Sequence, residues 1–136
     1  MSHLVLEIET SQFPSEPEGD LEYCNGMPGS HFANWIRERL LSTGVKCREV
    51  LQEDYGWGFW ADVDRFSVWV AVSCSGPADE GAAPMWHVMV NHEPGFLLWQ
   101  WFRRRAGLAA AAGIFKDVSN FIRGQVAGKI VHVDAA

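Results

Sequence analysis

Long apolar runs and an excess of basic residues are both missing from this chain of 136 residues. No stretch approaches the roughly 20 apolar residues that a helix needs to cross a bilayer, so we expect no membrane partner. The 11 Lys and Arg are outnumbered by 17 Asp and Glu, giving a net charge of −6. Because nucleic-acid phosphates attract dense positive charge, we expect no nucleic-acid partner. The N-terminus shows no secretory signal pattern.

Cysteine is also scarce, with three residues at wide spacings: Cys24, Cys47 and Cys74. An odd and widely spaced set excludes a disulfide scaffold and favours a reducing, cytoplasmic location. The compact spacings of zinc sites, Cys-x-x-Cys or His-Glu-x-x-His, do not occur. We therefore expect no metal and no cofactor, and the ordinary interpretation of the histidines is that they are solvated or hydrogen-bonded. The residues that a metal could recruit are Cys24, His31, His87 and His92.

What the chain does have is apolar and aromatic mass: it is 48% hydrophobic, with seven Trp and eight Phe. This composition predicts one domain over residues 1–136 with a proper core. Apolar patterning predicts the following elements: strands over 3–9, 45–51, 57–63, 66–74 and 84–92, and helices over 30–43, 96–105 and 108–123. Residues 129–134 form either a strand or an extended tail. Residues 10–29, rich in proline, glycine and acids, are predicted to be a flexible loop.

This order of elements predicts an α+β domain in two layers. We expect a mainly antiparallel sheet of four to six strands, one helix in the N-terminal half and two C-terminal helices on one side. The most specific expectation is a hairpin in which residues 57–63 pair with residues 66–72, so that Trp57 faces Val72. In this register both strands place their apolar residues on the same face. A longer loop than Asp64-Arg65 at the same register remains an alternative.

The opposite face of this hairpin would carry Trp60 directly across from Trp69. If strand 84–92 is the next neighbour, one patch forms on that face: Trp60, Trp69, Met85, His87 and Met89. Tryptophan and methionine are enriched at binding surfaces, so the patch is a candidate interface for a second copy, a protein partner or a small apolar ligand. The alternative is that the C-terminal helices cover it.

The junction between acids and aromatics just before the hairpin is the most distinctive motif, Glu53-Asp54-Tyr55-Gly56-Trp57. It resembles the Glu-Asp-Trp-Gly-Trp signature of a family of small, uncharacterised bacterial proteins, with Tyr55 in place of the more usual first Trp. The resemblance spans about residues 30–92 and implies a bacterial source and an α+β fold, but no activity. Glu53 and Asp54 either cap backbone amides there or form a polar site for a cation or a basic partner.

Enzymatic chemistry has weaker support. Cysteine catalysis needs a thiolate beside a base, and the candidates are Cys74 and His92. The pattern places Cys74 on the buried face with Val72, which favours a structural thiol. We therefore expect a non-enzymatic binding domain that uses the aromatic and methionine face. The alternatives are a small enzyme with a Cys/His or paired-carboxylate site, and an acidic, immunity-type protein that neutralises a basic toxin.

Overall fold

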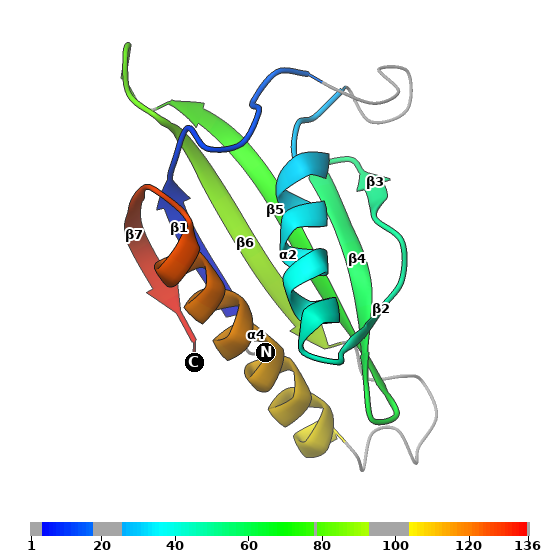
Figure 1. Ribbon diagram of the computed structural model, residues 1–136. Coiled ribbons are helices and arrows are strands. Elements are labelled where there is room, and N and C mark those ends of the chain that lie inside the picture. Colours follow the sequence, from blue (N-terminus) through cyan, green and yellow to red (C-terminus); the bar gives the residue numbers. More distant parts are fainter. Residues whose placement is uncertain (1–3, 18–25, 78, 93–103, 136) are drawn as a thin grey trace.

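The computed structural model describes residues 4–17, 26–77, 79–92 and 104–135 as one antiparallel sheet with two helices against one of its faces (Figure 1). In chain order the elements are β1 (Leu4–Glu9), α2 (Ser30–Ser42), β2 (Lys46–Cys47), β3 (Leu51–Glu53), β4 (Gly56–Val63), β5 (Phe66–Pro77), β6 (Pro84–His92), α4 (Arg104–Gln125) and β7 (Lys129–Asp134). Both helices lie in front of the sheet in Figure 1. The architecture is therefore α+β in two layers.

The strands follow the order β2-β4-β5-β6-β1-β7, and β3 also pairs with β4. The prediction of four to six strands and three helices is wrong, because the described residues form seven strands and two helices. The predicted strand 45–51 divides into β2 and β3, which pair with different ends of β4. Cys47 and Val50 both pack against the core. A continuous strand would turn these two side chains to opposite faces, since side chains alternate along a strand.

The C-terminal helix also differs from the prediction. In place of a break near residue 107, α4 runs without interruption from Arg104 to Gln125, while residues 96–103 lie outside the described residues. Gly107 lies inside this helix, where its lack of a side chain makes room for a neighbour. A Cβ there would collide with the imidazole of His92 on β6. The glycine therefore serves close packing of the helix on the sheet.

Helix α2 agrees with the predicted helix over 30–43. Its N-cap is Gly29, with φ 141°, and Ser30 is the first helical residue. The loop before it is held by Trp57, whose Nε1 donates a hydrogen bond to the carbonyl of Met27 at 2.7 Å. The side chains that α2 buries against the sheet are Phe32, Ala33, Ile36 and Leu40.

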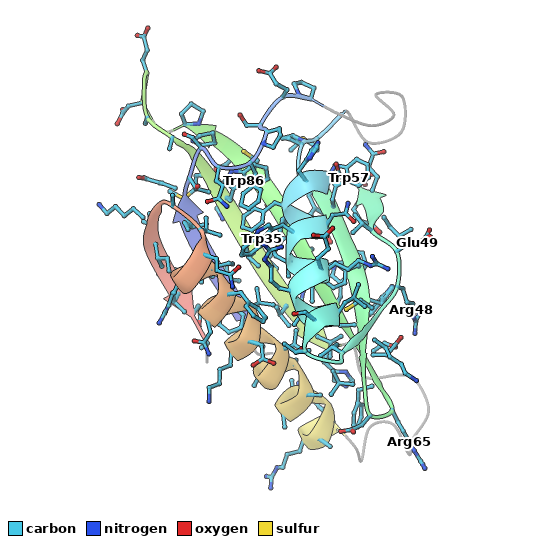
Figure 2. The ribbon with its side chains drawn as sticks, viewed as in Figure 1. Trp35, Arg48, Glu49, Trp57, Arg65 and Trp86 are labelled. Carbon is cyan, nitrogen blue, oxygen red and sulfur yellow. The ribbon has the colours of Figure 1, made fainter. Side chains whose placement is uncertain are left out.

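The register of the β4–β5 hairpin is confirmed: Trp57 pairs with Val72 and Trp60 pairs with Trp69. The turn contains only two residues, and Asp64 takes the left-handed conformation, φ 55°, that aspartate tolerates better than most residues. The face toward the helices holds the fully buried side chains of the hairpin, which are Phe59, Ala61, Val68, Val70 and Val72. In Figure 2 the labelled Trp35 and Trp86 lie on this same helix side of the sheet.

Candidate functional site

The candidate site is the sheet face turned away from the helices, which we call the outer face. The pairings of Trp60 with Trp69, Ala71 with Met89, and Ser73 with His87 place these side chains on that face. All five residues of the predicted patch lie on it and are half-buried: Trp60, Trp69, Met85, His87 and Met89. The buried side chains of α2 and α4 belong to the core on the opposite face. Within the described residues, neither helix covers the outer face.

A hollow of about 270 Å³ lies at the aromatic end of the outer face. We call it the aromatic hollow, and its lining residues are Glu53, Tyr55, Trp60, Trp69 and Asn91. The rings of Trp60 and Trp69 are 5.0 Å apart between centroids and are inclined at 55°. Asn91 is the pairing partner of Trp69 on β6. The hollow therefore joins the predicted tryptophan patch to one of the two predicted carboxylates.

The indole of Trp69 is positioned by Tyr55 in the motif and by Gly58, which follows the motif directly. A Cβ at Gly58 would come within 2.5 Å of Trp69 Cζ2, so the ring lies on the sheet over this glycine. Trp69 Nε1 donates a hydrogen bond to the hydroxyl of Tyr55 at 2.9 Å. Tyr55 and Gly58 thus hold the ring flat. Neither residue is among the predicted binding residues. Gly58 has no side chain that could signal a role, and the sequence does not show that the hydroxyl of Tyr55 reaches Trp69.

The two predicted carboxylates separate in the structure. Glu53 lines the aromatic hollow, whereas Asp54 is exposed in the turn after β3 and does not. Burial raises the pKa of the Tyr55 phenol, the hydrogen bond from Trp69 lowers that pKa, and the charge of Glu53 raises it further. Tyr55 is therefore neutral at physiological pH. The five lining residues carry one carboxylate and no basic group.

The other end of the outer face carries a polar line across three strands. His87 Nε2 lies 3.2 Å from the hydroxyl of Ser75 on β5, and His87 Nδ1 lies 3.6 Å from Glu7 Oε1 on β1. Ser75 sits at an irregularity of the β5–β6 ladder, between the pairs of Cys74 and Gly76. Of the three, only His87 was a predicted site residue. Alternation places Glu7 on a face but cannot reveal that β1 lies beside β6.

The predicted pair Cys74 and His92 is not brought together. On the β5–β6 ladder Cys74 pairs with Trp86 and His92 pairs with Val68, so about 20 Å of strand separates them. Burial raises the pKa of the Cys74 thiol, which disfavours the thiolate that catalysis requires. His92 lies against the ring of Phe66 at 5.4 Å, and its Nδ1 is buried without a hydrogen-bond partner among the described residues.

A metal site is not found in the part of the chain that the structure describes, where no three His, Cys, Asp or Glu side chains gather. His31 is exposed on α2, and Cys24 lies outside the described residues. Neither α2 nor α4 is long and apolar enough to cross a membrane.

Comparison of the chain with protein-family models, with curated proteins and with solved structures found no match. The resemblance of residues 53–57 to the bacterial motif therefore stays a prediction, and so does the bacterial source that it implies. With no relative to supply an activity, a functional conclusion has to come from the geometry of the outer face itself.

Proposed function

We propose that this protein is a non-enzymatic binding domain whose outer face recognises a protein with a basic surface. The observation that carries the proposal is the pair Trp60 and Trp69, held half-exposed beside the aromatic hollow. Large apolar side chains on a sheet face that no described helix covers are typical of interaction surfaces. Tryptophan in particular is enriched among residues that contribute most to binding energy.

Charge favours a basic partner over the other candidates. The chain has a net charge of −6, and Glu53 lies in the hollow itself. Glu7 and Glu9 lie further along the outer face, on β1. Complementary charge speeds encounter and suppresses wrong partners. Two copies of this acidic chain would repel each other, and a purely apolar ligand would leave Glu53 unused. A protein that neutralises a basic toxin is one kind of domain that meets this description.

The test is a binding screen read by nuclear magnetic resonance, with Trp60 and Trp69 as reporters. Short peptides of basic, acidic and apolar composition are titrated into the ¹⁵N-labelled chain, and the indole N–H signals are assigned from Trp60→Phe and Trp69→Phe. We expect basic peptides to shift these two signals and to leave that of Trp57 on the helix side unchanged. Peptide binding confined to other surfaces, or no binding by any basic peptide, contradicts the proposal.

One observation favours a second candidate, a serine hydrolase. The line Ser75–His87–Glu7 has the order of a nucleophile, a base and an orienting carboxylate. In such an enzyme Ser75 Oγ would attack an ester carbonyl while His87 takes the hydroxyl proton. His87 would pass that proton to the departing alcohol, and water would then release the acid. Labelling of Ser75 by a fluorophosphonate, lost in His87→Ala, favours this candidate; no labelling above Ser75→Ala removes it.

A cytoplasmic location is also part of the proposal. Cys47 and Cys74 are free thiols. Thiols persist unpaired in the reducing cytoplasm and tend to be oxidised outside it.

A further inference from the structure

We infer that the aromatic hollow binds a single basic side chain, a lysine or an arginine, presented by the protein partner. This inference rests on the proposed function and names what the partner inserts. It follows from three features of the hollow: its ring geometry, its charge and its size.

The ring geometry suits a cation. A cation is attracted to the face of an indole when it lies within about 6 Å of the ring centroid. The centroids of Trp60 and Trp69 are 5.0 Å apart, so the two rings touch each other, and one cation lying above the pair can come within about 6 Å of both centroids. The hydrogen bond from Trp69 Nε1 to Tyr55 ties down the positive edge of the Trp69 ring. A bound cation therefore meets the ring's electron-rich face rather than its N–H.

The charge of the hollow points the same way. Glu53 supplies a carboxylate, and Asn91 supplies an amide oxygen that can accept a hydrogen bond from an ammonium or guanidinium group. The raised pKa of Tyr55 keeps its hydroxyl neutral and available as a second acceptor. An anionic ligand would face Glu53 without any basic group in the lining to offset it.

The chain already contains one contact of this kind, on the helix side. The guanidinium of Arg39 lies 4.1 Å from the centroid of the Trp35 ring. Trp35 thus carries a cation from within the same chain. No such cation–ring contact involves Trp60 or Trp69 within the described residues. The two outer-face rings therefore remain open to a cation from a partner.

Size limits the ligand to something small. Sites for cofactors and drug-sized molecules usually have volumes of about 300–1,000 Å³. The aromatic hollow, at about 270 Å³, is below that range. It can hold the head of one side chain, whereas the rest of a partner would lie on Met89 and the neighbouring outer face.

The test compares charged probes with neutral isosteres in the full chain. N-acetyl-lysine methylamide is matched with the norleucine compound, and N-acetyl-arginine methylamide with the citrulline compound. Binding is followed at the indole N–H signals of Trp60 and Trp69. We expect dissociation constants in the millimolar range, with each charged probe at least about threefold tighter than its isostere. The tighter of the two charged probes identifies the side chain.

Two substitutions that each remove one negative charge test whether the preference for charged probes arises in the hollow. Glu53→Gln and Asp54→Asn each remove one carboxylate from neighbouring positions, but only Glu53 lines the hollow. We expect E53Q to weaken binding of the charged probe at least about threefold and D54N to leave it within about twofold, since the charge of Asp54 is exposed outside the hollow and screened by solvent. Trp69→Leu should abolish the preference for the charged probe, and Trp69→Phe should retain it. Equal effects of E53Q and D54N overturn the inference.

The outcomes also separate this inference from the function on which it rests. If basic peptides shift the outer-face signals but the charged probes bind no better than their isosteres, the inference fails and the proposed function stands. If neither peptides nor probes bind the outer face, both fail. E53Q exchanges one half-buried surface carboxylate for an amide of the same shape and should fold normally, so the test does not depend on the tolerance of the tryptophan positions.

Discussion

The two faces of the sheet are built from the same strands and yet differ in how their side chains are used. Phe59 and Trp60 are neighbours on β4: the first is fully buried beneath the helices, and the second is half-exposed on the outer face. On the helix side, the buried side chains of the sheet and of both helices form one hydrophobic cluster. On the outer face, Trp60 and Trp69 remain half-exposed beside the aromatic hollow. The comparison assigns the core to one face and leaves the other face for the recognition that we propose.

The largest expected effect compares these two neighbours directly. Phe59→Ala should lower the free energy of unfolding by about 3–5 kcal/mol, because it leaves a cavity in the core. Trp60→Ala should lower it by less than about 1.5 kcal/mol, since only the contacts of a half-exposed ring are lost. Urea denaturation followed by circular dichroism measures both. If the two variants are equally destabilised, the outer face is packed as a core face and the contrast is wrong.

A second comparison uses two glycines. Gly58→Ala should cost about 1–3 kcal/mol, because its Cβ would lie 2.5 Å from Trp69 Cζ2 and 2.7 Å from the carbonyl oxygen of Val70. Gly113→Ala is the control: nothing lies within 4 Å of its added Cβ on α4, so we expect a gain of about 0.5–1 kcal/mol. Thermal unfolding of both variants checks the signs.

The double variant Gly58→Ala/Trp69→Ala sharpens this test. Removing the indole relieves the contact with Cζ2 but leaves the contact with the Val70 carbonyl oxygen. The double variant should therefore be less destabilised than the sum of the single variants. Simple additivity would mean that the Trp69 ring does not lie over Gly58.

Apolar patterning along the sequence predicted the hairpin and the residues of its outer face, but not which strands lie beside the hairpin in the sheet. Alternation told which side Trp60 and Trp69 occupy, and the agreement between two apolar strands fixed their register. It could not show that β1 inserts between β6 and β7, because pairing between distant segments depends on tertiary packing. The contact of Glu7 with His87 follows from that insertion and was missed.

Two predictions were wrong for the same reason: the break in the C-terminal helix and the continuous strand over 45–51. Apolar patterning predicted separate helices over 96–105 and 108–123, yet α4 runs on from Arg104 and its Gly107 packs closely against His92. Residues 45–51 were predicted to form one strand, yet Cys47 and Val50 both pack against the core, and the segment divides into β2 and β3. In each case local propensity was overridden by packing against an element far along the chain.

A smaller effect concerns pH. The hydrogen bond from Arg48 lowers the pKa of Asp62, against burial, and Ser67 adds to the lowering. A lowered folded-state pKa means that the carboxylate stabilises the fold above its ordinary pKa of about 3.9. This stability is lost as pH falls from that value through the lowered folded-state pKa.

Asp62→Asn should therefore be less stable than the parent chain at pH 7, by less than about 1 kcal/mol because the pair is exposed. The difference should shrink as pH falls below the unfolded-state pKa of about 3.9, because Asp62 then becomes protonated first in the unfolded and afterwards in the folded state. Unfolding curves at several pH values provide the measurement, with Asp64→Asn as a control, because that turn residue is exposed and forms none of the ion pairs found among the described residues. A difference that grows toward acid pH contradicts the assignment.

The smallest expected effect concerns two indole N–H groups, that of Trp57 on the helix side and that of Trp69 on the outer face. Trp57 Nε1 donates to the carbonyl of Met27 at a partly buried position, and Trp69 Nε1 donates to Tyr55 at an exposed one. Tyr55→Phe should cost only a few tenths of a kcal/mol, because water can replace the lost hydroxyl. Its clearer signature is hydrogen exchange: the indole N–H of Trp69 should exchange faster, while that of Trp57 stays protected. Unchanged exchange at Trp69 would show that the hydroxyl of Tyr55 does not hold the Trp69 ring in place beside the aromatic hollow.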